Sequence, residues 1–230
     1  MADTFVIDVG AMPSVPVIGS KGRFPVHRIY CVGRNYAAHA REMGKDPDKE
    51  PPFFFLKPAD AVLPEGGDMD YPPGTSNLHH EIELVVALRR GGSQISATRS
   101  LDHVYGYAVG LDMTRRDLQL QARDMGRPWD FGKAFDQSAP ISAIYPVASH
   151  GHHSAGAIAL TVNGELRQHA DLNDMIWNVP DTIAFLSNYY ELQPGDLIFT
   201  GTPAGVGAVV RSDKLVGKIE GLGELRVNIV

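Results

Sequence analysis

Two acidic residues at strand spacing are the first side chains that could do chemistry. Glu81 and Glu83 stand at the start of the alternating apolar segment EIELVVAL, residues 81–88. In a strand, residues i and i+2 face the same side, about 7 Å apart along the chain. Burying two like charges is costly unless a divalent cation neutralises them. The spacing indicates a metal site, although a half-exposed strand with a solvated acidic face has the same pattern.

A third carboxylate follows another apolar segment. Asp112 ends the run YAVGLD, residues 107–112. A carboxylate at the end of a buried strand can supply a further oxygen ligand and leave positions open for water and substrate. The same position suits the N-terminal cap of a following helix. On this pattern alone, both interpretations stay open.

A histidine and a glutamate three residues apart could activate water. His39 and Glu42 lie in NYAAHAREM, residues 35–43, which is predicted to be a helix capped by Asn35 and ended by Gly44. On a helix, residues i and i+3 share a face, so the imidazole and the carboxylate can touch. Such a dyad can deprotonate a water molecule, which contributes roughly 10²–10⁴-fold to a rate. An exposed helix pair has the same spacing.

Two further segments could contact an anionic group. Lys133 stands between two phenylalanines in DFGKAF, residues 130–135, where its charge would stabilise an enolate or oxyanion; the alternative is a surface lysine. The turn TGTP, residues 200–203, is followed by Gly205 and Gly207, and its amides and hydroxyls can bind a carboxylate. It is not a phosphate loop, because no Gly-Lys-Ser/Thr follows.

The other histidines are not assigned to this chemistry. Three of them, His150, His152 and His153, lie in SHGHHS, where a surface loop with incidental metal affinity is expected. His79 and His80 directly precede the acidic pair. Neighbouring strand residues face opposite ways, so at most one of these two is expected to point at the site.

Many short strands and turns must position these side chains. The 24 glycines and 16 prolines are scattered through the chain, which favours short elements over a helix bundle. Asn163-Gly164 predicts a type I′ hairpin between residues 158–162 and 165–168. Strands outnumber helices and do not alternate with them, which disfavours a doubly wound parallel sheet. Strands are predicted at 27–32, 53–56, 81–88, 105–111, 197–200 and 225–230, and helices at 114–125 and, capped by Asp181, at 182–190.

Composition limits the class of protein. The chain has 230 residues, 43% of them hydrophobic, and no linker divides it, so one main domain is expected. A net charge of −6 gives no basic footprint for nucleic acid. No signal sequence and no apolar run of roughly 20 residues is recognised, so no membrane span is expected. The lone cysteine, Cys31, indicates a buried thiol in a reducing compartment, and a cytoplasmic protein is expected.

The order of the motifs is more specific than any one of them. The chain contains VGRNYAAHAREM (32–43), FFLKP (54–58), NLHHEIEL (77–84), GLDMTRRDLQ (110–119), GRPWDFGKAFD (126–136), VNGELRQ (162–168) and GDLIFTGTPAGVG (195–207). This series resembles the fumarylacetoacetate hydrolase family over about residues 26–230, and among its branches the short acylpyruvate and fumarylpyruvate hydrolases. Residues 1–25 are expected to be an N-terminal appendage to a single catalytic domain.

The resemblance implies a mostly β (α+β) fold, a mixed β-sandwich roll with a few short helices, and a homodimer. It also implies one Mg²⁺ or Mn²⁺ ion per subunit. By motif, the metal ligands are Glu81, Glu83 and Asp112, the water-activating dyad is His39 and Glu42, the enolate-stabilising lysine is Lys133, and the substrate-binding residues are Arg116, Gln119 and Thr202.

The implied reaction is hydrolysis of the C3–C4 bond of a 2,4-dioxo acid, with fumarylpyruvate giving fumarate and pyruvate in gentisate breakdown. The alternative is oxaloacetate decarboxylation, or hydroxymuconate isomerisation and decarboxylation, on the same metal-bound enolate. Fumarylpyruvate carries a second carboxylate, which calls for a cation at the far end of the pocket. Arg34, Arg41 and Arg127 are the candidates, and the sequence does not rank them.

Overall fold

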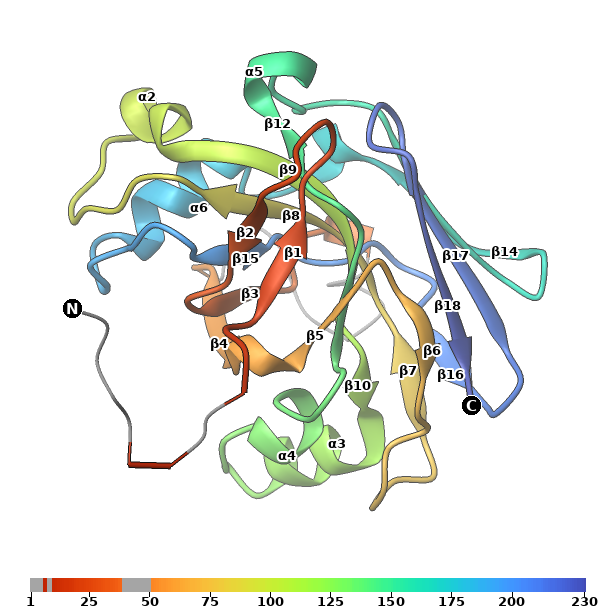
Figure 1. Cartoon of the computed structure of the whole chain (residues 1–230). Helices are drawn as coiled ribbons and strands as arrows, with labels where there is room; N and C mark the ends of the chain where they lie inside the picture. Colours follow the sequence, from red (N-terminus) through yellow and green to blue (C-terminus); the bar gives the residue numbers. More distant parts are fainter. Residues whose placement is uncertain (1–5, 8–9, 39–50) are drawn as a thin grey trace.

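Two curved sheets packed together make up the body of the molecule, with short helices at their margins (Figure 1). The computed structural model describes residues 6–7, 10–38 and 51–230. The predicted dyad, His39 and Glu42, therefore lies outside the described residues, as does Arg41. Within the described part the fold is mostly β, as predicted.

The larger sheet holds the strands that carry the acidic residues. Its neighbouring pairs are antiparallel except β15 with β3 and β11 with β5, so the sheet is mixed. In spatial order it contains β4 (Phe53–Lys57), β3 (Ile29–Gly33), β15 (Leu197–Phe199), β8 (Ile82–Leu88), β9 (Val104–Leu111), β11 (Ala139–Ile141) and β5 (Val62–Pro64), with β12 (Tyr145–Pro146) beside β9.

Three smaller sheets complete the β structure of the described residues. The five-stranded sheet has the order β14 (Glu165–Asp171), β13 (Ala157–Val162), β17 (Lys214–Ile219), β18 (Glu224–Ile229) and β6 (Gly67–Met69). A three-stranded sheet joins β10 (Thr114–Arg115), β7 (Leu78–His80) and β16 (Gly207–Val209), and a hairpin joins β1 (Ser14–Pro16) to β2 (Arg23–Pro25). The helices are α2 (Ala97–Ser100), α3 (Arg116–Asp124), α4 (Asp130–Lys133), α5 (Val147–His150) and α6 (Val179–Leu186), with 3₁₀ turns at Ala59–Ala61, Leu101–His103 and Leu172–Asp174.

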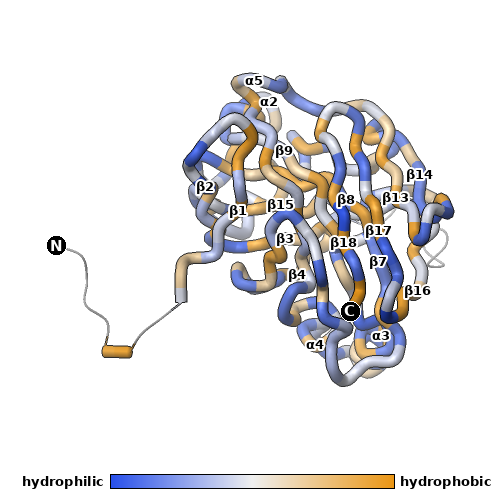
Figure 2. Tube along the Cα trace, turned by 45° about the vertical axis from the view of Figure 1, so that its right-hand side comes forward, coloured by the Kyte–Doolittle hydropathy of each residue, from blue (hydrophilic) through white to orange (hydrophobic). Residues whose placement is uncertain are grey.

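Strand β8 is buried on both faces, because the larger sheet has a core on each side. Leu84 and Val86 pack with side chains of the five-stranded sheet, such as Leu160. Val85 belongs to the other core, which includes Val15 of the β1–β2 hairpin. Figure 2 shows hydrophobic residues concentrated along these central strands. A polar side chain on β8 is therefore in an apolar setting unless something pairs with it.

Some local predictions hold and others need correction. The Asn163-Gly164 hairpin is confirmed, with φ angles of 53° and 84° as a type I′ turn requires. The helix predicted from Thr114 begins only at Arg116, because the two residues before it pair with β7. The cap of α6 is Asn178, whose side chain accepts the N–H of Asp181, so the prediction of Asp181 as the cap is wrong.

Asn35, predicted as a helix cap, is buried and ties two other segments together. Its amide donates to the carbonyl oxygens of Trp177 (2.8 Å) and Thr200 (2.7 Å) and accepts the N–H of Trp177. These bonds fix the chain after β3 against the turn that follows β15. Nothing in the described part of the chain is a helix of the length and apolarity needed to cross a membrane.

Candidate active site

Strand register brings the three predicted carboxylates together. Glu81 lies between β7 and β8, Glu83 on β8, and Asp112 directly after β9. Strands β8 and β9 are antiparallel, and the N–H of Asp112 donates to the carbonyl of Glu81 at 2.8 Å. One ligand atom from each of the three side chains lies within 4.8 Å of the others, and all three residues are at most 5% exposed. The alternative of a solvated acidic face is therefore wrong.

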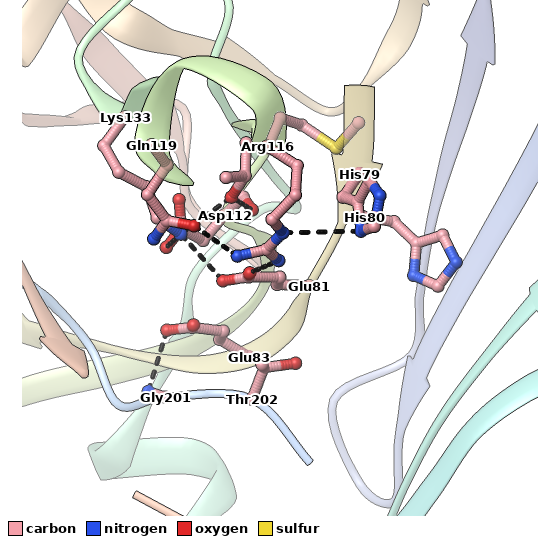
Figure 3. Close-up of polar contacts among 12 residues, drawn as sticks. His79, His80, Glu81, Glu83, Asp112, Arg116, Gln119, Lys133, Gly201 and Thr202 are labelled. Atoms are coloured by element: carbon pink, nitrogen blue, oxygen red, sulfur yellow. Dashed lines mark hydrogen bonds and ion pairs between the residues drawn. The ribbon is translucent and has the colours of Figure 1, made fainter. Parts of the chain in front are cut away.

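Lys133 bridges two of these carboxylates. Its Nζ donates to Glu81 Oε2 at 2.8 Å, to Asp112 Oδ2 at 2.6 Å and to Thr114 Oγ1 at 2.7 Å (Figure 3). Burial alone would lower the pKa of Lys133, but the charges of Asp112 and Glu81 outweigh burial and raise the pKa. The ammonium is therefore held charged at the centre of the site, and the alternative of a surface lysine is wrong.

Lys57 is a buried cation that the sequence analysis did not single out. It ends β4, is 2% exposed, and its Nζ lies 2.9 Å from Asp112 Oδ1. The same Nζ also donates to the carbonyl oxygens of Met113 and Lys133. The only sequence signal was a lysine closing the apolar run FFFLK. Lys57 and Lys133 thus each form an ion pair with a different oxygen of Asp112.

The negative charge of Glu83 has far less stabilisation from neighbouring groups than the charges of Glu81 and Asp112 have. Its Oε2 accepts a hydrogen bond from the N–H of Gly201 at 2.8 Å (Figure 3). Burial, followed by the negative charges of Asp112 and Glu81, raises the pKa of Glu83 well above 4.5. Ionising this carboxyl is therefore costly unless further positive charge is present. A hard divalent cation among three carboxylates supplies that charge, so the donor set fits Mg²⁺ or Mn²⁺.

Arg116 and Gln119 project from one face of α3 toward Glu81. The Arg116 guanidinium forms an ion pair with Glu81 Oε1 and donates to Gln119 Oε1. Its Nε also donates to His79 Nδ1 at 3.5 Å (Figure 3). Burial, then the charge of Arg116, lowers the pKa of His79 to about 4, so this imidazole is neutral at pH 7. His80 points away from the carboxylates, as expected if only one of the two histidines faces the site.

Gln168 positions Thr202 and is a second residue that sequence reasoning missed. The Gln168 amide donates to Thr202 Oγ1 at 2.8 Å and to the Pro203 carbonyl at 2.9 Å. Its Oε1 accepts the N–H of Ile82 at 3.1 Å and the Nδ1–H of His80 at 3.0 Å. Gln168 ends the motif VNGELRQ, residues 162–168, but an uncharged glutamine at this position gives no sequence signal of a role in the site.

These residues surround one cavity of about 220 Å³. The three carboxylates, Arg116, Gln119, Lys133 and Thr202 line it together with Phe53, Phe55 and Trp129. The cavity thus joins a charged region to an aromatic wall, as expected for a site that binds a small polar molecule with a carbon chain. Arg127 does not line it.

The histidine-rich segment lies outside this group of residues. His150 and His152 are exposed, and the Tyr107 hydroxyl lies 2.9 Å from His152 Nδ1. His153 is half-buried, and its ring stacks edge-on to Tyr107 at 5.5 Å. Within the described ranges, these histidines join no group of metal-ligating side chains.

Comparison with known proteins agrees with the geometry. A fumarylpyruvate hydrolase of Ralstonia sp is 49% identical over 189 residues, which are 81% of this chain and 98% of that protein. Mitochondrial oxaloacetate tautomerase FAHD1 of Rattus norvegicus is 43% identical over 201 residues, 87% of this chain and 90% of that protein. The crystal structure of fumarylpyruvate hydrolase from Pseudomonas aeruginosa in complex with Mn²⁺ and pyruvate has a TM-score of 0.97 and 55% identity, covering 99% of both chains.

A family pattern also matches this chain over most of its length. The pattern of the fumarylacetoacetate (FAA) hydrolase C-terminal domain covers residues 28–230. That range contains every residue of the cavity described above. The predicted resemblance is confirmed: this chain belongs to the fumarylacetoacetate hydrolase family.

Proposed function

We propose that this protein is a divalent-metal-dependent hydrolase that cleaves the C3–C4 bond of a 2,4-dioxo acid, with fumarylpyruvate giving fumarate and pyruvate. The observation that carries the proposal is the buried group of Glu81, Glu83 and Asp112 facing Lys133 inside a cavity. The similarity to proteins named fumarylpyruvate hydrolase, at 49% and 55% identity, supports this substrate.

Glu81, Glu83 and Asp112 would hold one Mg²⁺ or Mn²⁺ ion. When bound, such an ion acts as a Lewis acid on substrate oxygens and offsets negative charge that develops during the reaction. Thr202 and Arg116 would orient the 1-carboxylate and 2-oxo group of the substrate, with Gln119 beside them. Thr202 and Gln119 line the cavity, and Gln168 fixes the hydroxyl of Thr202.

The proton transfers are assigned to the dyad. Glu42, assisted by His39, would deprotonate the water that attacks the C4 carbonyl, after which the C3–C4 bond breaks. The electrons of that bond pass to C3, which makes the leaving group the enolate of pyruvate. Lys133 would stabilise this enolate, since its ammonium is buried and held charged by its neighbours. Protonation at C3 then releases pyruvate.

The test is an assay of fumarylpyruvate hydrolysis. The reaction is monitored through the loss of the near-ultraviolet absorbance of the conjugated enol of the substrate. We expect loss of absorbance with Mn²⁺ and none after the metal is removed by chelation. Glu42→Gln should keep Mn²⁺ binding in calorimetry and lose hydrolysis, whereas Glu165→Gln, at an exposed hairpin position, should behave as the wild type. No metal-dependent loss with the wild-type protein would refute the proposal. A near-normal rate of hydrolysis for Glu42→Gln would exclude the dyad from the proposed mechanism.

Enol chemistry without hydrolysis is the second candidate. A relative named oxaloacetate tautomerase is 43% identical to this chain, and decarboxylation of oxaloacetate or a hydroxymuconate would use the same kind of site. Hydrolysis places solvent oxygen in the released acid, and the other reactions do not. Mass spectrometry of fumarate formed in ¹⁸O-labelled water therefore separates them.

The cellular setting and the subunit number are a separate part of the proposal. We propose that the protein acts in the cytoplasm as a homodimer in the breakdown of aromatic compounds, with no nucleic-acid or membrane partner. Light scattering of the purified protein measures the subunit number, and a monomer at working concentration would contradict the homodimer.

A further inference from the structure

The wall of the cavity carries an arginine held on an aromatic ring. Arg34 directly follows β3, and its guanidinium carbon lies 5.1 Å from the centre of the Phe53 ring. A side chain at Gly33 would meet this ring, since an added Cβ would lie 2.0 Å from it. The backbone at Arg34 is left-handed, with φ of 58°, which is uncommon for a residue other than glycine. Close packing of the chain against Phe53 thus places the Arg34 side chain at the cavity.

A second arginine reaches the same cavity from α3. Arg116, Gln119, Leu120 and Arg123 follow the spacing of one helix face, and all four line the cavity. Arg116 is committed to Glu81, whereas Arg123 lies seven residues further on, about 10 Å along the axis at 1.5 Å per residue. The Arg123 side chain is 45% exposed and bonds the neighbouring Asp124 at 2.8 Å and 3.0 Å. An exposed pair of this kind is weak and exchanges readily for another carboxylate.

The two arginines stand where the far end of a dioxo acid would reach. A seven-carbon chain has six carbon–carbon bonds of about 1.5 Å, which span roughly 7–8 Å when extended. With the 1-carboxylate held near Arg116, the far end of such a chain extends along α3 toward Arg123. Phe53 and Trp129, whose rings pack edge-on at 5.4 Å, line the cavity beside this path and suit an alkene.

We propose that Arg34 and Arg123 form a second carboxylate subsite, which makes this protein selective for 2,4-dioxo dicarboxylic acids over 2,4-dioxo monocarboxylic acids. The selectivity for a dioxo acid rests on the function proposed above. The charges lining the cavity agree with a substrate of two or more negative charges. Among the described residues the lining has four cationic side chains against three carboxyl groups, so it is net positive before any metal is bound; the cations are Arg34, Arg116, Arg123 and Lys133, and the carboxyl groups are Glu81, Glu83 and Asp112.

The structure also distinguishes Arg34 from Arg127, two candidates for binding the second carboxylate that the sequence did not rank. Arg127 does not line the cavity; it lines one surface depression with Met125 and Phe131 and another with Phe53 and Trp129, two residues of the cavity wall. Arg123 was not among the predicted candidates, because its place on the inner face of α3 depends on how the helix packs. Arg127 therefore serves as a control of the same charge: an arginine four residues from Arg123 that does not line the cavity itself.

Binding of substrate analogues tests the subsite without requiring turnover. 2-Oxoheptanedioate and 2-oxoheptanoate have the same carbon chain and differ in the second carboxylate, and neither has the 4-oxo group needed for cleavage. In calorimetry with the Mn²⁺-loaded protein, we expect the dicarboxylate to bind at least about tenfold more tightly. Arg34→Gln and Arg123→Gln should each reduce this ratio by about tenfold, and Arg127→Gln should leave it unchanged. Arg34→Lys keeps the charge and should retain part of the preference.

Steady-state kinetics is a second test of the carboxylate subsite. For Arg123→Gln, the ratio of kcat/KM for fumarylpyruvate to that for acetylpyruvate should fall by about tenfold, through KM for fumarylpyruvate. An unchanged binding ratio in both Arg34→Gln and Arg123→Gln, or an equal fall in Arg127→Gln, would overturn the subsite. Failure of the wild type to cleave either dioxo acid would refute the proposed reaction instead, and the calorimetric ratio would still test the two arginines.

Discussion

Replacing Gln168 by methionine should weaken the whole protein and the substrate site together. Gln168 is 1% exposed on β14, and all four of its contacts are internal. It receives hydrogen bonds from Ile82 and His80 and donates to Thr202 and Pro203. The amide thereby joins the strand that carries the acidic pair to the turn that follows β15.

The expected magnitude follows from what the substitution leaves behind. Methionine fills nearly the same volume, so little cavity forms. The Ile82 N–H and the Pro203 carbonyl cannot rotate away, and each becomes a buried group without this partner, at about 1–3 kcal/mol apiece. We therefore expect the free energy of unfolding to fall by about 3–4 kcal/mol. For a domain of this size, each kcal/mol lowers Tm by about 2–4 °C, so Tm should drop by about 10 °C.

Urea unfolding of Gln168→Met measures this change. Gln121→Met, at an exposed position of α3, is the control and should stay within about 0.5 kcal/mol of the wild type. Because Thr202 loses its partner, KM for fumarylpyruvate should also rise in Gln168→Met. A loss below about 1 kcal/mol would refute the reasoning, since the two backbone groups would then have found other partners.

Three further substitutions or reactions probe the charged cluster. Because the pKa of Glu83 is raised above 4.5, the native metal-free protein keeps a proton that the unfolded chain releases, so its stability should fall as the pH rises above 4.5. Glu83→Gln should remove this slope in urea titrations at several pH values, and an unchanged slope would exclude Glu83 as its source. Lys133→Met breaks buried pairs with Glu81 and Asp112 and should cost about 3–5 kcal/mol of stability and about 10²–10³-fold in kcat; near-normal values of both would contradict its role. Burial, then the charge of Asp112, raises the pKa of the Cys31 thiol well above 9.0, so a thiol reagent should react no faster than the protein unfolds, whereas rapid labelling of the folded protein would show an accessible thiol.

Local patterns predicted the parts of the site that depend on strand geometry. The alternation of Glu81 and Glu83 and the position of Asp112 after an apolar run follow from the two-residue period of a strand. The structure brings these three side chains together because β8 and β9 pair as neighbours. Their grouping was therefore accessible from the sequence, while their roles as metal ligands stay predictions.

Long-range packing determined what the sequence did not reveal. Lys57 reaches Asp112 although three strands, β3, β15 and β8, lie between β4 and β9 in the sheet. No spacing along the chain encodes such a contact. Thr114 begins a segment with helical character, yet strand pairing with β7 outweighs that local preference. Asn178 could have been found, because a proline two residues later favours the first turn of a helix.

The net charge of −6 says little about what the protein binds, because the charges that matter are buried and local. Surface charges are screened over about 8 Å at physiological ionic strength, whereas contacts of 2.6–2.9 Å inside the protein are not. In the described core of the site, Lys57, Arg116 and Lys133 face three carboxyl groups, and the Glu83 carboxyl keeps its proton in the metal-free protein, so a bound divalent cation leaves the site net positive. An acidic protein can therefore attract a dicarboxylate into this cavity, since the positive charge of the site arises from the metal and the arginines at its wall.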